Sequence, residues 1–308
     1  MRIAVQMDHI SGLNIESDTT LALCLEAQSR GYKLFQYLPD KITYYEGMLK
    51  AIVEEMEVID KVGDHFKLCE PYSADLNNFD IILMRQEPPF DMSYITYTHL
   101  LEHLDKKVRI INNPVSVRNS PEKLLVTHFY DLMPKTIISR DIDEIILFAK
   151  SHDKLVLKPL FGKGGEGIIL LDINDDNFLE TLKEYLKNEN EPIMVQEFLP
   201  NVKEGDKRII LLNGKPVGCL NRIPAEGEFR SNLGVGGKPV LSELTPSDKE
   251  ICNRIENKLI DLELYFVGID VIGEYITEIN VTCPTGIRQI KKLGGPDIAK
   301  LFWDGLEL

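Results

Sequence analysis

The chain has 308 residues and a formal net charge of −14 at pH 7. This length allows two or three domains, and the acidic balance argues against binding to a nucleic-acid backbone, which needs a basic surface. The five cysteines include no C-x-x-C pair, so neither a disulfide framework nor a zinc ribbon is indicated. No apolar run approaches a membrane span and the first residues do not form a signal peptide, so we expect a cytoplasmic protein without a membrane partner.

The N-terminal third alternates strands and helices, as is typical of a parallel sheet. Asp18 can cap the first helix and Gly31 can end it. Ligands of such sheets bind beyond the carboxyl ends of the strands, where Arg85 stands, although a surface salt bridge would also explain this arginine. The predicted strands span residues 2–7, 32–37, 80–85 and 108–111, and the predicted helices span 19–30 and 94–104.

A domain boundary is predicted just before residue 121. Ser120 is expected to cap a helix that has Pro121 in its first turn. Short strands and helices then follow, which favours a sheet with helices on one side. Glycines concentrate in residues 224–238, a composition that favours a mobile loop. The predicted strands span 135–139, 154–160, 167–172, 193–198 and 208–212, and the predicted helices lie near 143–150 and 177–187.

A glycine-rich turn at residues 162–167 joins two predicted strands. It contains G-x-G-x-x-G, but the apolar run after it reads as a strand, whereas the Rossmann fingerprint requires a helix there. A glycine hairpin over nucleotide phosphates, with Lys158 of the preceding strand facing them, fits better. An ordinary tight hairpin and a lysine that reaches the surface are the alternatives.

Two further segments carry polar groups that suit a nucleotide site. Glu197 and the backbone around Phe198 and Leu199 could bind the edge of a purine, although an ordinary strand end is equally consistent. Arg208 and Arg222 lie at the ends of one predicted hairpin that turns at Asn213-Gly214. They could clamp a phosphoryl group and a carboxylate, or they could be solvated surface residues.

A predicted hairpin over residues 266–282 carries Asp270, Glu278 and Asn280 where strands normally carry apolar side chains. Two carboxylates and an amide suit a hard cation such as Mg²⁺, with phosphate oxygens completing its shell. Glu278 and Asn280 share a face, but Asp270 joins them only if the turn has three residues, 273–275. A solvated acidic face is the alternative interpretation.

The residues 99–103 spell H-x-x-E-H, the inverted zinc-protease pattern, on a predicted helix. His99 and His103 would share a face of that helix. A third ligand with suitable spacing is missing from the sequence, so an amphipathic helix with surface histidines is the preferred interpretation.

Taken together, these segments resemble bacterial glutathione synthetases, which are ATP-grasp ligases, along essentially the whole chain. The resemblance implies an α/β protein with the ATP-grasp fold. Its parts would be an N-terminal Rossmann-like, pre-ATP-grasp α/β domain (1–120), a small lid domain (121–200) and a C-terminal α+β domain (201–308). The segments that carry the resemblance are Met7-Asp8, Asn14-Ile15 with Asp18, 26–32, 84–91, 122–124, 157–160, 205–208, 222–224 and, above all, 267–287.

The resemblance also implies a role for each site residue. Two ions of Mg²⁺ or Mn²⁺ would accompany bound ATP. Two positions near the expected site depart from the family's pattern, because Cys283 stands where serine is common and His9 where proline is usual. By position, the catalytic residues would be Arg208 and Arg222; the ATP-binding residues Lys123, Lys158, Gly162, Gly164, Gly165, Gly167, Gln196, Glu197, Phe198, Leu199, Glu204, Asp206 and Lys207; the substrate-binding residues Asp18, Arg85, Arg222, Asn280, Cys283 and Thr285; and the metal ligands Asp270, Glu278 and Asn280.

The activity that the resemblance implies is the ligation of γ-glutamylcysteine with glycine through an acyl phosphate, giving glutathione, ADP and phosphate. The implied partners are these substrates and further copies of the chain, in a dimer or tetramer. Another ATP-grasp ligase with a different substrate pair, and a nucleotide-binding regulatory protein without turnover, are the alternatives.

Overall fold

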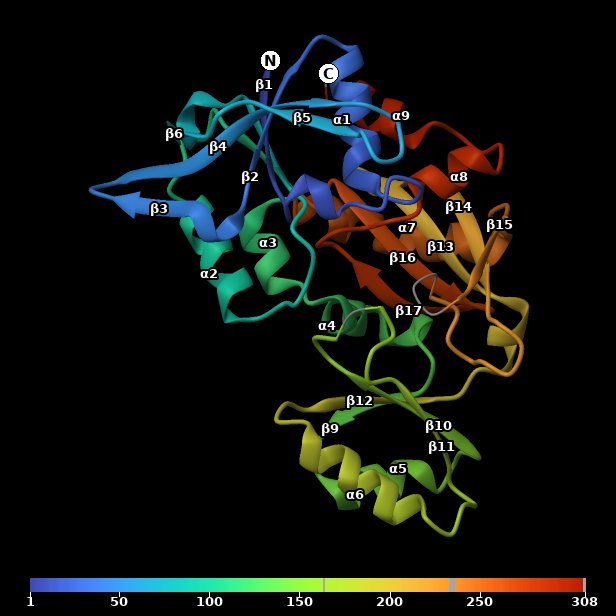
Figure 1. The fold of residues 1–308 in the computed structure, drawn as a ribbon. Coiled ribbons are helices and arrows are strands. Elements are labelled where there is room, and N and C mark those ends of the chain that lie inside the picture. The colour runs from blue at the N-terminus through green and yellow to red at the C-terminus, as the bar shows by residue number, and fades with distance from the viewer. Residues whose placement is uncertain (163, 233–235, 307–308) are drawn as a thin grey trace.

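The computed structural model describes residues 1–162, 164–232 and 236–306. Its strands form three sheets, which Figure 1 shows as an upper body that holds the first and third sheets and a lower lobe that holds the second. The first strand, Arg2–Gln6, and the last described helix, Ile298–Asp304, both lie in the upper body. None of the helices in the described ranges has the length and apolar character that spanning a bilayer requires.

The first sheet has the strand order β3-β4-β2-β1-β7-β8, with β5 and β6 also pairing with β4. The neighbours β2, β1, β7 and β8 run parallel, as predicted. The antiparallel strands β3 to β6 were not predicted. The bounds are β1 Arg2–Gln6, β2 Lys33–Tyr37, β3 Ile42–Tyr45, β4 Met48–Val58, β5 Phe66–Leu68, β6 Tyr72–Asp75, β7 Ile81–Met84 and β8 Arg109–Ile111.

Alternate residues of β1 enter two different cores. Ile3 and Val5 pack in the cluster that contains α1 and the C-terminal helix α9, whereas Ala4 packs in the cluster that contains α2 and α3. Asp18 caps α1 as predicted, accepting a hydrogen bond from Leu21 N at 2.6 Å. These helices are α1 Thr19–Ser29, α2 Met92–Leu101, α3 Pro114–Asn119 and α9 Ile298–Asp304, with short 3₁₀ helices at Ile10–Gly12, Pro39–Lys41 and Leu76–Asn78.

The predicted cap of the next helix was wrong. Ser120 does not cap it; this residue ends α3, and the four-residue helix α4, Glu122–Leu125, begins after Pro121 without a side-chain cap. The physical reason is that Leu124 N and Leu125 N both bond the carbonyl oxygen of Pro121, so the turn closes on the backbone. A 3₁₀ helix, Val126–Leu132, then leads to the lower lobe.

The lower lobe is an antiparallel sheet of order β11-β10-β12-β9 with its two helices on one face, as predicted. Leu155 and Leu157 of β10 pack against these helices. Val156 and Lys158 therefore point to the opposite face, toward the upper body. The bounds are β9 Thr136–Ser139, α5 Ile142–Ala149, β10 Lys154–Pro159, β11 Ile169–Asp172, α6 Phe178–Asn188 and β12 Ile193–Glu197.

The third sheet has the order β15-β14-β13-β16-β17, so the predicted strand at 208–212 belongs here and not to the lobe. β13 and β14 turn at Asn213-Gly214, as predicted, with both residues at positive φ. The domain boundaries after 120 and 200 stay predictions. The bounds are β13 Asp206–Leu212, β14 Lys215–Ile223, β15 Lys238–Leu241, α7 Pro246–Asp261, β16 Phe266–Ile272, β17 Tyr275–Asn280 and α8 Ile287–Lys292, after a 3₁₀ helix at Pro200–Glu204.

The turn at Gly214 provides a stability test with a matched control. A Cβ on Gly214 would lie 2.9 Å from Glu256 Cγ, whereas a Cβ on Gly47, at the same place in the β3–β4 turn, would meet nothing within 4 Å. Both glycines have positive φ. We expect Gly47→Ala to lower the free energy of unfolding by about 1 kcal/mol and Gly214→Ala by roughly 1–3 kcal/mol more, because it adds a clash. Urea unfolding measures both; equal losses would contradict the clash.

Candidate active site

The hairpin β16–β17 places Asp270 and Glu278 directly opposite each other. The prediction of a three-residue turn was wrong, since Ile272 pairs with Tyr275 and the turn has only two residues. A β-bulge compensates, because the register shifts between Asp270 and Val271 and Thr277 is the extra residue. The expected arrangement of Asp270 and Glu278 on one face is therefore met by a different device.

Asp270 is buried within a cluster of charges. Arg208, its cross-strand partner on β13, donates from Nε to Oδ1 at 2.5 Å and from Nη2 to Oδ2 at 2.9 Å. Arg222 Nη2 lies 3.0 Å from Oδ1 and 2.6 Å from Asp206 Oδ2. Burial opposes ionisation, but the two guanidinium groups outweigh it and hold the pKa of Asp270 well below its usual range. For Asp206, burial dominates and raises the pKa.

Two lysines reach the same region from different elements. Lys123 of α4 donates from Nζ to the carbonyl oxygen of Gly162 at 3.1 Å and lies 3.6 Å from Glu278 Oε1. Lys158 of β10 is buried, and this burial lowers the pKa of its ammonium group. An anionic ligand would stabilise both ammonium groups, since burying a charge without full compensation is costly.

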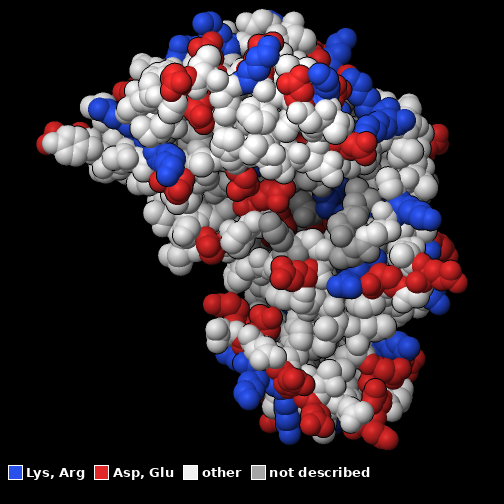
Figure 2. Space-filling model, in the orientation of Figure 1, with Lys and Arg blue, Asp and Glu red and all other residues white. Residues whose placement is uncertain are grey.

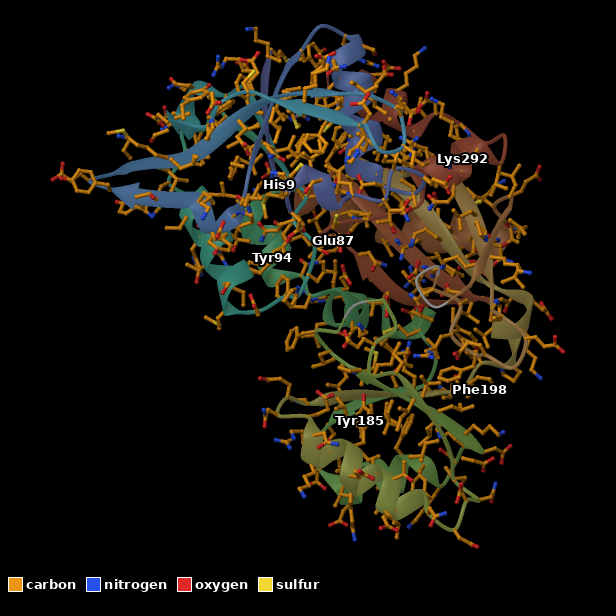
Figure 3. The ribbon with its side chains drawn as sticks, viewed as in Figure 1. His9, Glu87, Tyr94, Tyr185, Phe198 and Lys292 are labelled. Carbon is orange, nitrogen blue, oxygen red and sulfur yellow. The ribbon has the colours of Figure 1, made fainter. Side chains whose placement is uncertain are left out.

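A small cavity of about 80 Å³ lies between the lobe sheet and the third sheet. Val156, Lys158 and Gln196 form its wall on the lobe side, with the residues that follow β12. Phe198, labelled in Figure 3, belongs to this wall. The opposite wall comes from Asp206, Asp270, Ile272, Thr277 and Glu278.

A larger cavity of about 490 Å³ adjoins it. Figure 2 shows the hollow at the junction of the upper body and the lower lobe, with basic side chains inside it and acidic ones beside it. Glu278 lines both cavities, so they meet at the hairpin. The predicted site residues that line the larger cavity are Lys123, Gly162, Gly164, Gly165, Arg208, Arg222, Glu278, Asn280, Cys283 and Thr285.

Several predicted site residues lie elsewhere. Lys207 points away from both cavities, because its neighbours Asp206 and Arg208 face them and side chains alternate along a strand; its Nζ pairs with buried Asp248 and donates to the carbonyl oxygen of Glu243 at 3.1 Å. Glu204 is exposed beyond the cavity walls. The structure thus argues against ATP contacts for Lys207 and Glu204.

Asp18 and Arg85 lie behind the larger cavity. Arg85 is buried and donates to Thr20 Oγ1 at 3.0 Å and to the carbonyl oxygen of Pro284 at 3.1 Å. The carbonyl oxygen of Arg85 accepts from Cys283 Sγ at 3.3 Å. Arg85 therefore supports the segment that carries Cys283 and Thr285, whereas Asp18 caps α1, the helix that carries Thr20.

Gly167 and Glu197 take part in the structure around the smaller cavity. The carbonyl oxygen of Gly167 accepts from Tyr185 of α6 at 2.8 Å, and Glu197 Oε1 accepts from Lys135 N at 2.8 Å. Lys163, and residues 233–235 of the predicted loop 224–238, lie outside the described residues.

Glu122 and Asn232 are among the cavity residues that were not predicted from the sequence. Glu122 is half-buried beside Lys123 and accepts from Thr282 Oγ1 at 2.7 Å; the loss of water around its carboxyl group, together with nearby Glu278, raises its pKa. Asn232 lines both cavities, and a Cβ on Gly165 would lie 2.9 Å from its Oδ1. Glu122 could have been suspected from its position next to Lys123, but nothing in the sequence around Asn232 indicates this contact.

The zinc interpretation finds no support. His99 Nδ1 pairs with Glu102 at 3.2 Å, and the ring of His103 packs on Tyr44 with a centroid distance of 4.5 Å. In the described ranges, no group of three His, Cys, Asp or Glu side chains could hold a metal ion.

The donor chemistry at the hairpin does fit Mg²⁺ or Mn²⁺. Asp270, Glu278 and Asn280 come together, with Asn280 Nδ2 3.4 Å from Asp270 Oδ2. Oxygen donors of this kind suit hard divalent cations. Because the set contains only two carboxylates, a metal here would need further oxygen ligands, which nucleotide phosphates can provide.

Comparison with known proteins identifies the family. The model of the prokaryotic glutathione synthetase N-terminal domain matches residues 1–118, and that of the prokaryotic glutathione synthetase ATP-grasp domain matches residues 122–295. The chain belongs to the prokaryotic glutathione synthetase family. The glutathione synthetase of Agrobacterium fabrum is 52% identical over 99% of this chain and 96% of its own, and that of Brucella melitensis is 52% identical over 100% and 98%.

Solved structures confirm the ATP-grasp fold. The D-cycloserine synthetase DcsG superposes with a TM-score of 0.70 at 11% identity, covering 99% of this chain and 98% of the other. The ligase PsnB, solved with a minimal precursor, Mg and ADP, superposes with a TM-score of 0.64 at 12% identity, covering 99% and 96%. At this identity only the fold is shared, but it is shared along the whole length of this glutathione synthetase family member.

Lys158 and Lys207 give a matched test of the nucleotide site, because Lys158 lines the smaller cavity and Lys207 points away from both cavities. We expect Lys158→Met to weaken ATP binding about 10- to 100-fold, the range of a hydrogen bond to a charged group. Lys207→Met should leave ATP affinity unchanged. It should lower the free energy of unfolding by roughly 3–5 kcal/mol instead, because Asp248 is left buried and unpaired.

Calorimetric titration with ATP and urea unfolding give the two quantities for each variant. Weaker ATP binding by Lys207→Met would show that the lysine reaches the nucleotide after all.

Proposed function

We infer that this chain is a glutathione synthetase, an ATP-dependent carboxylate–amine ligase that joins γ-glutamylcysteine to glycine. The observation that carries this inference is the likeness along the full chain to proteins named glutathione synthetase, at about half of all positions. The site supports it, since it offers arginines, lysines and carboxylates around two adjoining cavities. Phosphoryl transfer needs such positioning and charge neutralisation.

In our proposal the adenine lies in the smaller cavity, against Gln196 to Leu199. Lys158 and Lys123 bind the phosphates, and the glycines at 162, 164, 165 and 167 cover them with backbone N–H groups. Asp270, Glu278 and Asn280 would hold two Mg²⁺ or Mn²⁺ ions, which neutralise phosphate charge when bound. Asp206 would keep Arg222 in place through their ion pair.

The substrate carboxylate of γ-glutamylcysteine would lie in the larger cavity against Arg222. One carboxylate oxygen attacks the γ-phosphorus of ATP, the bond to the bridging oxygen breaks, and ADP leaves. Arg208 neutralises charge on the transferred phosphoryl group. The glycine amine then attacks the carbonyl carbon of the acyl phosphate, losing a proton, and phosphate leaves. Water must be excluded until then, because it would hydrolyse the acyl phosphate.

Asn280, Cys283 and Thr285 would contact the peptide, with Arg85 supporting their segment from behind. Cys283 does not serve as a nucleophile here. Burial raises the pKa of its thiol to about 12, so the reactive thiolate is scarce at neutral pH.

The proposal extends to location and assembly. We propose a cytoplasmic location, which the need for ATP supports. We also propose a homo-oligomer, a dimer or tetramer, supported by four exposed apolar side chains on β3 and β4: Tyr44, Tyr45, Met48 and Ile52. Sedimentation equilibrium would measure the mass of the assembly.

An omission experiment tests the reaction. We expect ADP release to need γ-glutamylcysteine, glycine and Mg²⁺ together, with one glutathione formed per ADP, because the acyl phosphate goes on to product only with the amine present. Coupled ADP detection and mass spectrometry of the product measure this. Turnover that is independent of γ-glutamylcysteine but needs another peptide or amino acid would point to a different substrate pair on the same fold.

Arg222 gives the corresponding test of residue roles. We expect Arg222→Met to lower kcat by about 10²–10³-fold, the usual effect of losing one charge-stabilising donor. Lys215→Met is the matched control on the same strand, since Lys215 is exposed and pairs with Glu256. Steady-state kinetics on variants with a native circular-dichroism spectrum decide the matter; a similar kcat for both variants would exclude Arg222 from catalysis.

A further inference from the structure

Segments from three parts of the fold meet at one point beside the larger cavity. Pro88 and Phe90 follow β7, Phe161 and Gly162 follow β10, and Thr282 follows β17. Only about 10 Å³ of free space remains among them, so they are closely packed. The contact therefore joins the N-terminal sheet to the chain that enters the glycine turn.

Two aromatic contacts form this junction. The rings of Phe90 and Phe161 are stacked, with centroids 6.2 Å apart and planes at 13°. Phe90 also lies 5.1 Å from the ring of Tyr94, a buried residue of α2. Figure 3 shows Tyr94 and Glu87 on the N-terminal side of the junction. A row of three rings thus runs from α2 to the residue that precedes Gly162.

The glycine turn needs contacts of this kind to fix its position. Gly164, Gly165 and Gly167 have positive φ, and a Cβ on Gly164 would meet nothing within 4 Å. At the far end, Tyr185 of α6 holds the carbonyl oxygen of Gly167, but that helix belongs to the same lobe. At the near end, Phe161 rests on Phe90, which belongs to the upper body.

The segment just before Phe90 forms part of the wall of the larger cavity. Glu87 and Pro88 line this cavity, and Glu87 N donates to Asp8 Oδ2 at 3.0 Å. Phe90 follows Pro88 by two residues. A movement of this wall would therefore be transmitted to Phe161 and to Gly162, whose carbonyl oxygen binds Lys123.

We propose that Phe90 is a positioning residue: its stack on Phe161 holds the glycine turn over the nucleotide phosphates and couples that position to the peptide-binding wall at Glu87 and Pro88. This inference rests on the proposed function for the identity of the reaction. Without the stack, the turn keeps its anchor within the lobe and the hydrogen bond from Lys123 to Gly162. It loses its aromatic contact with the upper body, so ATP is held less firmly and the acyl phosphate is less protected from water.

The test compares Phe90→Ala, Phe161→Ala and the double variant. We expect each single change to weaken binding of a non-hydrolysable ATP analogue with Mg²⁺ about two- to tenfold, the range of an aromatic pair. The double variant should lose no more than a single one, because both remove the same contact. ADP released per glutathione formed should rise above one. Phe90→Tyr should restore both quantities.

Met92→Ala is the control, since Met92 lies two residues further on and its side chain is 71% exposed. Phe90→Leu keeps an apolar side chain without the ring and replaces the alanine variant if that unfolds. Wild-type affinity and wild-type coupling in a folded Phe90 variant would overturn the proposal, as would additive losses in the double variant. If the wild type forms no glutathione, the proposed function fails. The binding of the ATP analogue to the wild type and the variants, measured by calorimetric titration, still tests the stack.

Discussion

The site is organised by one buried cluster in which two arginines neutralise two aspartates. Arg208 and Asp270 face each other across β13 and β16, and Arg222 on β14 forms ion pairs with both Asp270 and Asp206. Removing any one member would leave the buried cluster with an uncompensated net charge, and breaking a buried pair in this way typically costs about 3–5 kcal/mol. The cluster is neutral as a whole. ATP carries about four negative charges at neutral pH, so two divalent cations bound with it would preserve this neutrality.

Strand alternation decides which residues reach that cluster. Asp206 and Arg208 face the cavities, and Lys207 between them faces α7, where it pairs with Asp248. The sequence alone contained this information, because a period of two excludes three successive residues from one face. The resemblance carried Lys207 into the nucleotide site by position, and the alternation argues against it. The same alternation on β10 sends Leu157 to the lobe core and Lys158 to the smaller cavity.

The parts of the fold that the sequence predicted are those with strong local signals. The parallel core, the capping aspartate and the Asn213-Gly214 turn all follow from apolar runs and turn chemistry. The strands between residues 42 and 75 were overlooked, although β4 alternates buried Leu49, Ala51 and Val53 with more exposed residues. The ends of strands were predicted to within two residues in most cases, because glycine, proline and charged residues mark them.

The bulge at Thr277 could not be predicted, because it depends on pairing between strands and on what each face must contact. With a regular ladder, Ile276 and Glu278 would share a face, since they are two residues apart. The core requires the isoleucine, which is fully buried, and the cavity requires the carboxylate. One extra residue satisfies both, and Thr277 Oγ1 donates to the carbonyl oxygen of Asp270 at 3.2 Å across the irregularity. The hairpin can therefore bury Ile276 in the third sheet and present Glu278 to the cavity only because the bulge at Thr277 lies between these two residues.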